Sequence, residues 1–353
     1  MHNKLFIPGP TEVILEVREQ LAKPMIGHRG KEFSKLFAET SDKLKKLFYT
    51  KNHCFISTSS ALGVMEACVR NCVKEKSLNL VCGSFSERWY KLVGECGKKA
   101  DAVKVEMGKA IKPEMVEEKL ETGEYDSVFL THNETSTGVM NPLEEIAEVV
   151  KKYPDVVFMV DCVSSLSGVK VDADKLGIDV CLASVQKCLA LPPGLAVFSC
   201  SQKALDRTKE IPNRGYYFDF QQFLKYYEKQ QTISTPSIPH IFALNYQLDR
   251  IFAEGLEQRF ERHLKMAEFT REWALERGFK LFPEEGYESI TLTCVENTKG
   301  INVGEVIKKV KEKGMEFGNG YKDLKEKTFR IAHMGDLQMD DVKELLEAID
   351  GAL

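Results

Sequence analysis

Short apolar segments alternate with amphipathic segments through the first two thirds of the chain. Runs of four or five apolar residues without polar alternation are typical of strands that are buried on both faces of a sheet. Seven strands are predicted, over residues 54–57, 78–82, 102–105, 127–131, 156–160, 180–183 and 196–199. Helices are predicted between most of them, over residues 61–73, 87–96, 113–121 and 143–152. The pattern predicts an α/β fold in which a mostly parallel seven-stranded sheet carries helices on both faces.

The pattern of segments changes near residue 255. A long charged helix is predicted over residues 257–277, and further helices over 303–313 and 339–352. Strands are predicted over residues 289–294 and 328–332. Because 353 residues exceed what one compact domain usually needs, we predict two domains. These are a large domain over residues 1–254 and a smaller C-terminal α+β domain over residues 255–353.

Charge and cysteine content narrow the class of protein. The 49 basic and 53 acidic residues are interspersed and give a net charge of −4, which indicates neither a nucleic acid nor a membrane as partner. The N-terminus has no apolar signal core, and no apolar run approaches the roughly 20 residues of a membrane helix. Ten cysteines are scattered, and Cys68 and Cys72 lack a second ligand pair, so no metal site is predicted. A cytoplasmic protein with reduced thiols is expected.

Small, hydroxyl and charged residues follow five of the predicted strands. In an open α/β sheet, ligands bind beyond the carboxyl ends of the strands. The sequence therefore predicts a ligand site at one edge of the sheet. The five runs are residues 58–63, 83–88, 132–138, 161–165 and 184–187.

Two charged residues at this edge suggest a particular chemistry. Asp161 follows five apolar residues, and a buried carboxylate needs a cationic partner such as a protonated pyridine nitrogen. Lys187 lies between two apolar segments, where partial burial would lower its pKa and make the amine nucleophilic. Taken alone, Asp161 could instead cap a turn, and Lys187 could lie in a surface loop.

Two weaker features lie at the same edge. The turn over residues 58–63 opens a helix and could hold a phosphate with backbone N–H groups, although it matches no standard phosphate motif. Its Ser and Thr residues could equally serve only as helix caps. Phe85 could stack on a planar ring or be an ordinary core aromatic.

In combination, these motifs resemble the class V, fold-type I pyridoxal-phosphate enzymes, and in particular the alanine–glyoxylate / serine–pyruvate aminotransferase branch. The most specific part is Asp161 followed 26 residues later by Lys187. The resemblance extends over nearly the whole chain. The segments that carry it are residues 8–11, 25–29, 83–88, 131–138, 160–165, 184–187, 232–236 and 329–335.

The resemblance implies pyridoxal 5′-phosphate as cofactor and a set of site residues. Lys187 would hold the cofactor as a Schiff base and carry protons, and Asp161 would pair with the pyridinium nitrogen. Arg330 would bind the substrate α-carboxylate, with Gly27 near the substrate. The other implied cofactor contacts are Ser60, Ala61, Leu62, Phe85, Thr135, Val163, Gln186, Thr232 and Thr235.

The resemblance also implies a homodimer with shared active sites. Thr232 and Thr235 would come from the partner chain, and an N-terminal arm over residues 1–20 would reach the partner subunit. Two departures concern the phosphate contacts. Ala61 and Leu62 stand where relatives carry glycine or small polar residues, and Thr232 stands where some carry tyrosine.

The implied function is a ping-pong transamination from a small L-amino acid, alanine or serine, to pyruvate or glyoxylate. The alternatives are transamination of 2-aminoethylphosphonate or another class V substrate, lyase or desulfurase chemistry, and a non-catalytic cofactor-binding module. An α-carboxylate clamp at Arg330 favours α-amino acids. A desulfurase needs a cysteine on a mobile late loop, whereas Cys294 falls in a predicted strand.

Overall fold

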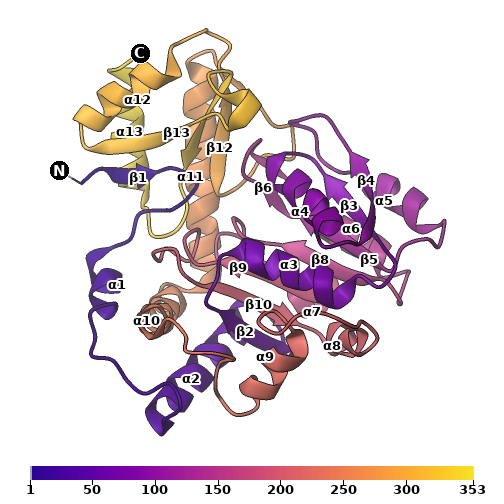
Figure 1. Cartoon of the computed structure of the whole chain (residues 1–353). Coiled ribbons are helices and arrows are strands. Elements are labelled where there is room, and N and C mark those ends of the chain that lie inside the picture. The colour runs from indigo at the N-terminus through magenta and orange to yellow at the C-terminus, as the bar shows by residue number, and fades with distance from the viewer. Residues whose placement is uncertain (1) are drawn as a thin grey trace.

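The structure, a computed structural model, describes residues 2–353, so Met1 of the predicted N-terminal arm lies outside the described residues. Its largest element is a seven-stranded sheet (Figure 1). The strands are β2 His53–Ser57, β3 Lys76–Val81, β4 Lys99–Lys104, β5 Ser127–Thr131, β8 Val157–Asp161, β9 Val180–Ser184 and β10 Ala196–Cys200. They are ordered β2-β10-β9-β8-β5-β3-β4, and β10 is antiparallel to both neighbours while the other pairs are parallel. The predicted seven-stranded, mostly parallel sheet is confirmed.

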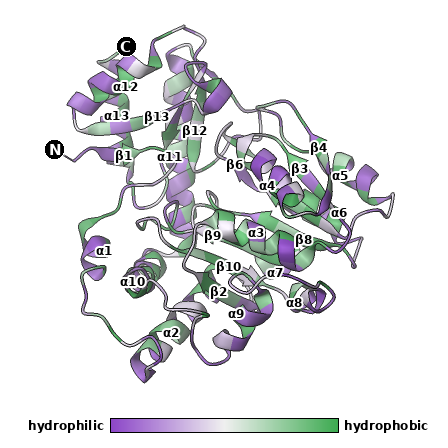
Figure 2. Cartoon of the chain, in the orientation of Figure 1, coloured by the Kyte–Doolittle hydropathy of each residue, from purple (hydrophilic) through white to green (hydrophobic). Residues whose placement is uncertain are grey.

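Helices cover both faces of this sheet, because successive strand residues point to opposite faces. Cys54 and Ile56 pack into one core, whereas Phe55 between them packs into the other. Figure 2 shows the strands as predominantly hydrophobic and the helices as mixed. The first face is covered by α1 Leu15–Gln20, α2 Lys31–Leu47, α5 Pro113–Leu120, α6 Leu143–Val150, α7 Ala173–Leu176 and α10 Ile238–Glu254. The second face is covered by α3 Ala61–Cys72, α4 Ser84–Glu95, α8 Gln202–Lys209 and α9 Phe220–Tyr227.

A second, five-stranded sheet has the order β1-β13-β14-β12-β11 and lies at the top of Figure 1. Its strands are β1 Lys4–Phe6, β11 Lys280–Leu281, β12 Leu292–Glu296, β13 Met315–Asn319 and β14 Thr328–Ala332. It packs with α11 Leu256–Glu276, α12 Val303–Glu312 and α13 Met339–Asp350 around a separate core. The predicted boundary at residues 254 and 255 falls between α10 and α11. Between β13 and β14 lies one 3-10 turn, η1 Lys322–Leu324.

The N-terminal strand β1 belongs to this second sheet. It pairs in parallel with β13, and Phe6 is fully buried in the core of the C-terminal helices. Residues 4–6 of the predicted large domain thus pack with the C-terminal part of the same chain. A short hairpin, β6 Asn133–Glu134 and β7 Val139–Met140, follows β5 at the edge where the candidate site lies. Within residues 2–353, no helix is both long and apolar enough to cross a membrane.

Candidate active site

Asp161 and Lys187 lie at the carboxyl ends of neighbouring strands. Asp161 is the last residue of β8 and pairs with Leu182 of β9, and Lys187 follows the end of β9 by three residues. Because β8 and β9 are parallel, both side chains are delivered to the same edge of the sheet. The two residues on which the sequence interpretation depends are therefore brought together.

Asp161 is a buried carboxyl group that receives few hydrogen bonds from the protein in place of those it would make with water. Its side chain is 4% exposed, and within residues 2–353 its one side-chain hydrogen bond comes from the backbone N–H of Val163, at 2.8 Å. Desolvation raises the pKa of Asp161 to about 7, against the lowering effects of the Val163 N–H and the nearby Lys187. A cation such as a pyridinium nitrogen would complete this site.

Lys187 is half-buried beneath the N-terminal segment of its own chain. Its ammonium group donates to the carbonyl oxygen of Pro8, and the Thr11 hydroxyl donates to the Lys187 carbonyl oxygen over 3.0 Å. Gly9 has φ of +130°, and a Cβ atom there would lie 2.5 Å from the Lys187 Nζ, so only glycine fits this close approach.

The electrostatic surroundings of Lys187 favour the neutral amine. Burial, followed by the positive charge of Arg330, lowers the pKa of Lys187 to about 8, while Asp161 opposes this shift. A lysine with such a pKa presents a much larger fraction of neutral, nucleophilic amine at physiological pH than an exposed lysine does.

Phe85 is held in place by Glu134, whose role the sequence did not reveal. Glu134 is fully buried in β6, and its carboxylate accepts hydrogen bonds from the Phe85 N–H at 3.1 Å and the Ser86 N–H at 2.9 Å. The hydroxyls of Ser86 and Ser136 donate to it as well, at 2.9 and 2.5 Å. A carboxylate at the N-terminus of α4 also has a favourable interaction with the helix dipole. The signal in the sequence was an acidic residue just after a buried strand.

Arg330 is a buried guanidinium on β14. It is 9% exposed, and it donates to the carbonyl oxygens of Asn319 at 3.1 Å and Thr135 at 3.2 Å. Burial lowers the pKa of Arg330 from its usual value. No acidic side chain of residues 2–353 forms an ion pair with it, so the guanidinium can accept a carboxylate from a ligand. The Thr135 hydroxyl donates to Ser164 Oγ at 2.9 Å.

The predicted phosphate turn has an uncapped helix end. Ser60 is the N-cap of α3 and makes no side-chain capping hydrogen bond, which leaves backbone N–H groups at the helix start for an anion. Ala61 is buried and Leu62 is 40% exposed. Gln186 accepts a 2.6 Å hydrogen bond from the Ser184 hydroxyl at the end of β9, and Val163 is half-buried beside Asp161.

Three predicted residues are not joined to this group by hydrogen bonds within the described chain. Gly27 is exposed, and Thr235 lies 3.4 Å from the ring nitrogen of His28. The carbonyl oxygen of Thr232 accepts a 2.8 Å hydrogen bond from Arg29. These segments contact one another, which links residues 27–29 with residues 232–235.

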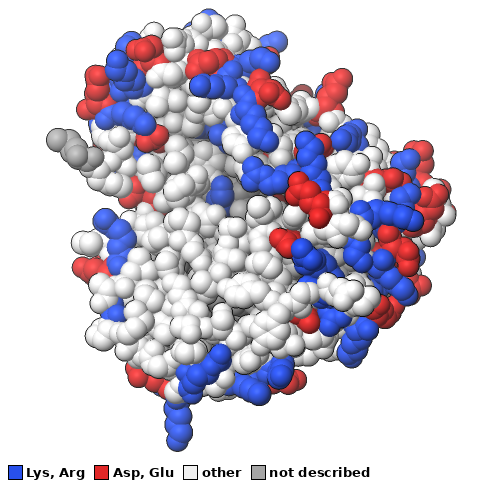
Figure 3. Space-filling view, in the orientation of Figure 1, with Lys and Arg blue, Asp and Glu red and all other residues white. Residues whose placement is uncertain are grey.

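The residues that are brought together fit pyridoxal phosphate. No cation of residues 2–353 forms an ion pair with Asp161, Lys187 presents an activated amine, and α3 presents an uncapped N-terminus. Figure 3 shows a hollow between the upper and lower parts of the molecule, with a basic side chain visible among uncharged atoms. A cofactor held at its ring nitrogen, aldehyde and phosphate would use all three groups.

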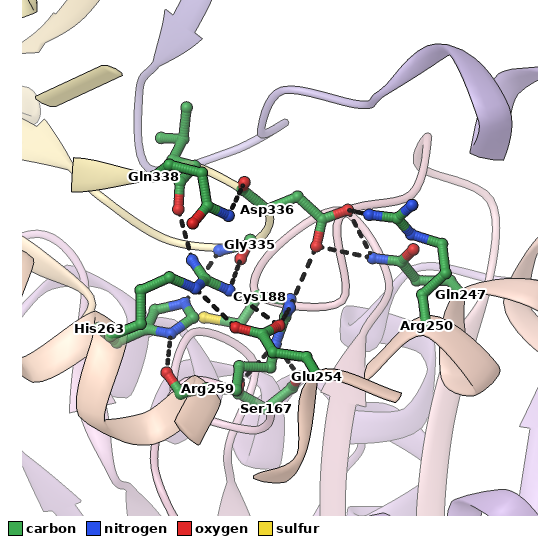
Figure 4. Close-up of polar contacts among 12 residues, drawn as sticks. Ser167, Cys188, Gln247, Arg250, Glu254, Arg259, His263, Gly335, Asp336 and Gln338 are labelled. Carbon is green, nitrogen blue, oxygen red and sulfur yellow. Dashed lines mark hydrogen bonds and ion pairs between the residues drawn. The ribbon is translucent and has the colours of Figure 1, made fainter. Parts of the chain in front are cut away.

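A buried polar network contacts Cys188, the residue that follows Lys187 in the chain (Figure 4). Arg259 of α11 is 1% exposed and donates to the Cys188 carbonyl oxygen at 2.8 Å and to the Ser167 hydroxyl at 3.0 Å. It also forms ion pairs with Glu254 at 2.7 Å and Asp336 at 3.1 Å. The network connects the Lys187 loop with the loop that follows β14.

Comparison with known proteins identifies the family. The sequence model of the family described as Aminotransferase class-V matches residues 9–322, most of the chain. The chain belongs to the class V aminotransferases. The match includes every predicted cofactor residue, whereas Arg330 lies just beyond it.

This aminotransferase is similar to other proteins over nearly its whole length. It is 42% identical to an uncharacterized aminotransferase of Methanocaldococcus jannaschii, over 99% of this chain and 92% of the other. It is 31% identical to a serine–glyoxylate aminotransferase of Methylorubrum extorquens, over 99% and 90% of the two chains. The crystal structure of an alanine–glyoxylate aminotransferase from Nostoc sp. superposes with a TM-score of 0.94 at 28% identity, over 100% and 95% of the chains.

The family assignment confirms the predicted enzyme class and fold of this aminotransferase. The predicted cofactor, pyridoxal 5′-phosphate, is confirmed as well. The roles of the individual site residues stay predictions.

Proposed function

We propose that this aminotransferase moves the amino group of a small L-amino acid, alanine or serine, to a small 2-oxo acid, glyoxylate or pyruvate. The observation that carries the proposal is the buried Arg330, which has no acidic partner among residues 2–353 and lies close enough to Lys187 to lower its pKa. A carboxylate on Arg330 would place an α-amino group near the Lys187 amine. The names of the serine–glyoxylate and alanine–glyoxylate relatives support the same substrate class.

The proposed chemistry divides between cofactor and protein. When bound, the cofactor supplies an electron sink for the substrate α-carbon. Lys187 would hold the cofactor covalently and would move a proton to and from the substrate α-carbon, and Asp161 would keep the ring nitrogen protonated. Arg330 orients the substrate by a bidentate contact.

The remaining predicted contacts enclose the cofactor. Phe85 and Val163 would pack against the cofactor ring, and Thr135 would bind near the phenolic oxygen. The backbone at the start of α3 and the Gln186 side chain would hold the phosphate. The residues proposed for that phosphate contact are Ser60, Ala61, Leu62 and Gln186.

We also propose a homodimer in which each subunit completes the other's site. Thr232 and Thr235 would reach the partner's cofactor phosphate, Gly27 would lie near the partner's substrate, and the N-terminal segment would contact the partner subunit. A broad uncharged surface below the hollow in Figure 3 supports such an interface. Met25 is 65% exposed, and a subunit contact would remove this apolar side chain from water.

We propose a cytoplasmic location because the cysteine thiols are not paired in disulfides. All ten cysteines are free, and nine of them are buried. A reducing compartment keeps such thiols unpaired. The proposed partners are small amino acids and oxo acids, without a nucleic acid or a membrane.

The decisive experiment is a matrix of amino donors and oxo-acid acceptors with purified holoenzyme. We expect L-alanine or L-serine with glyoxylate or pyruvate to give the highest kcat/KM, and the donor alone to bleach the visible band in a single half-reaction. Lys187→Ala should abolish turnover, whereas Lys99→Ala, at an exposed edge position, should leave it unchanged. Turnover confined to 2-aminoethylphosphonate, or pyruvate release from serine by elimination, would contradict the proposal.

The assembly is tested separately by sedimentation and by mixing inactive variants. Lys187→Ala and Thr235→Trp subunits would each be inactive alone. A mixed dimer with shared sites should regain part of the activity, because one of its two sites contains neither substitution. A fully active monomer would contradict the shared-site proposal.

A further inference from the structure

Tyr321 lies where the two parts of the molecule meet beside the active site. It precedes η1 in the connection between β13 and β14, and it is half-buried. Its ring stacks on Phe85 of α4, with centroids 5.3 Å apart and planes inclined by 20°. Such a near-parallel pair at this distance is a favourable aromatic contact.

Tyr321 also contacts the proposed carboxylate-binding residue. The guanidinium carbon of Arg330 lies 5.6 Å from the centre of the Tyr321 ring, within the range of a cation–π interaction. The same ring is thus placed against Phe85, which is proposed to cover the cofactor, and Arg330, which is proposed to bind the substrate. No other aromatic ring of residues 2–353 has both of these contacts.

The hydroxyl group of Tyr321 is fixed from the large sheet's side. Arg88 Nη2 donates to it at 3.0 Å, and the guanidinium of Arg88 lies 5.4 Å from the centre of the Phe85 ring. Arg88 therefore contacts both stacked rings and Arg330 contacts Tyr321, and the stack joins α4 to the β13–β14 connection.

An open cleft of about 430 Å³ is lined by sequence neighbours of the two rings, whereas the rings themselves do not line it. Arg88 and Ser84 of α4 line it, together with Lys322, the residue next to Tyr321. Figure 3 shows basic and acidic side chains gathered over α4. The cleft is large enough for a small-molecule side chain.

We propose that Tyr321, held by Arg88, is the residue that limits the size of the substrate side chain, by separating the space between Phe85 and Arg330 from this cleft. The inference rests on the proposed function, since it assumes a substrate carboxylate on Arg330. A side chain that extends from the α-carbon toward α4 meets the Tyr321 ring. Small donors are accepted, and long unbranched donors are excluded by contact with the ring.

Substitutions at Tyr321 distinguish the effect of its aromatic ring from that of its hydroxyl group. Tyr321→Phe keeps the ring, so the ratio of kcat/KM for L-norleucine to that for L-alanine should stay within threefold of the wild-type ratio. Tyr321→Ala opens the site to the cleft, so the ratio of kcat/KM for L-norleucine to that for L-alanine should rise at least tenfold. Arg88→Ala removes the support of the ring and should shift the ratio in the same direction by a smaller factor. Tyr90→Ala, on the same helix and in contact with Lys104 rather than the stack, is the matched control.

A binding measurement tests the inference without turnover. Propanoate and hexanoate carry the carboxylate but no amine, and their dissociation constants for the holoenzyme can be measured by titration calorimetry. The ratio of the hexanoate affinity to the propanoate affinity should be at least tenfold higher in Tyr321→Ala than in the wild type. If no small amino acid reacts with wild-type enzyme, the proposed function fails, yet the two carboxylates still report on Tyr321.

A ratio unchanged within twofold in Tyr321→Ala, both for the donors and for the carboxylates, would overturn the inference. If Tyr321→Ala does not fold, Arg88→Ala and Tyr321→Ser provide the same comparison. An equal shift in Tyr90→Ala would assign the effect to a general loosening of α4 and would also overturn it.

Discussion

Arg259 donates a 2.8 Å hydrogen bond to the carbonyl oxygen of Cys188, the residue that directly follows Lys187. The same guanidinium pairs at 3.1 Å with Asp336, which lies six residues after Arg330. One buried side chain of α11 thus contacts the loop that carries Lys187 and the loop that follows β14, the strand of Arg330.

Replacing Arg259 should destabilise the protein. Arg259→Met leaves Glu254 and Asp336 without their common partner, and the loss of one partner of a buried ion pair costs about 3–5 kcal/mol. Arg259→Lys keeps the charge but cannot reach all the acceptors, so an intermediate loss is expected. Urea unfolding measures both. Arg70→Met removes a surface pair with Glu66 and should cost less than about 1 kcal/mol; an equal loss in both Met variants would contradict the role of the network.

The reactivity of Lys187 should reveal its lowered pKa. With a pKa of about 8, the fraction of Lys187 that is neutral in the cofactor-free enzyme should rise steeply between pH 7 and 9 and change little above that range. Competitive acetylation followed by mass spectrometry measures this for each lysine peptide. Lys152, whose pKa is raised by Glu117, is the control and should gain reactivity only at higher pH. Parallel profiles for the two lysines would show that burial does not activate Lys187.

Asp161→Asn should stabilise the cofactor-free enzyme at pH 8. The folded state raises the pKa of Asp161 from 3.8 to about 7, so it binds the proton more tightly than the unfolded chain does. Stability from this group is complete at low pH and is lost as the pH rises toward 7, at a cost of roughly 4 kcal/mol.

The difference between wild type and Asp161→Asn should therefore be large at pH 8 and shrink toward pH 5, as measured by urea unfolding at both values. The same substitution should weaken retention of pyridoxal phosphate, because the ring nitrogen loses its counter-charge. A difference in stability that is independent of pH would contradict the raised pKa.

Glu134→Gln should loosen the start of α4. The carboxylate accepts from three backbone N–H groups and two hydroxyls, and an amide cannot accept all of them. A loss of about 2–4 kcal/mol is expected, since buried hydrogen bonds to a charged group are at stake. Glu87→Gln, on the same helix but paired at the surface with Lys104, should cost less than about 1 kcal/mol. Thermal unfolding of the two variants compares them, and equal shifts would argue against the capping role.

The local pattern of apolar residues predicted the central sheet, but it did not predict where several helices and strands begin and end. Residues 127–131 and 328–332 form strands with the predicted bounds, because each run is apolar or buried throughout. Helix α4 begins at Ser84 rather than at the predicted residue 87, since Glu134 satisfies the backbone N–H groups of Phe85 and Ser86. The strand predicted over residues 289–294 lies at Leu292–Glu296, because the Ser289 hydroxyl bonds the N–H of Thr291 and holds a turn.

The sequence alone determined the sheet and the places of Asp161 and Lys187 at or just after the ends of two of its buried strands, because these follow from hydrophobic periodicity and from the residues that end buried strands. Only the tertiary structure decided that β1 joins the C-terminal sheet, that Glu134 holds Phe85, and that Tyr321 stacks between Phe85 and Arg330. β1 and β13, Glu134 and Phe85, and Phe85 and Tyr321 are far apart in the chain. The energies of these contacts depend on distances and burial that no local pattern encodes, so the contacts exist only once the chain has folded.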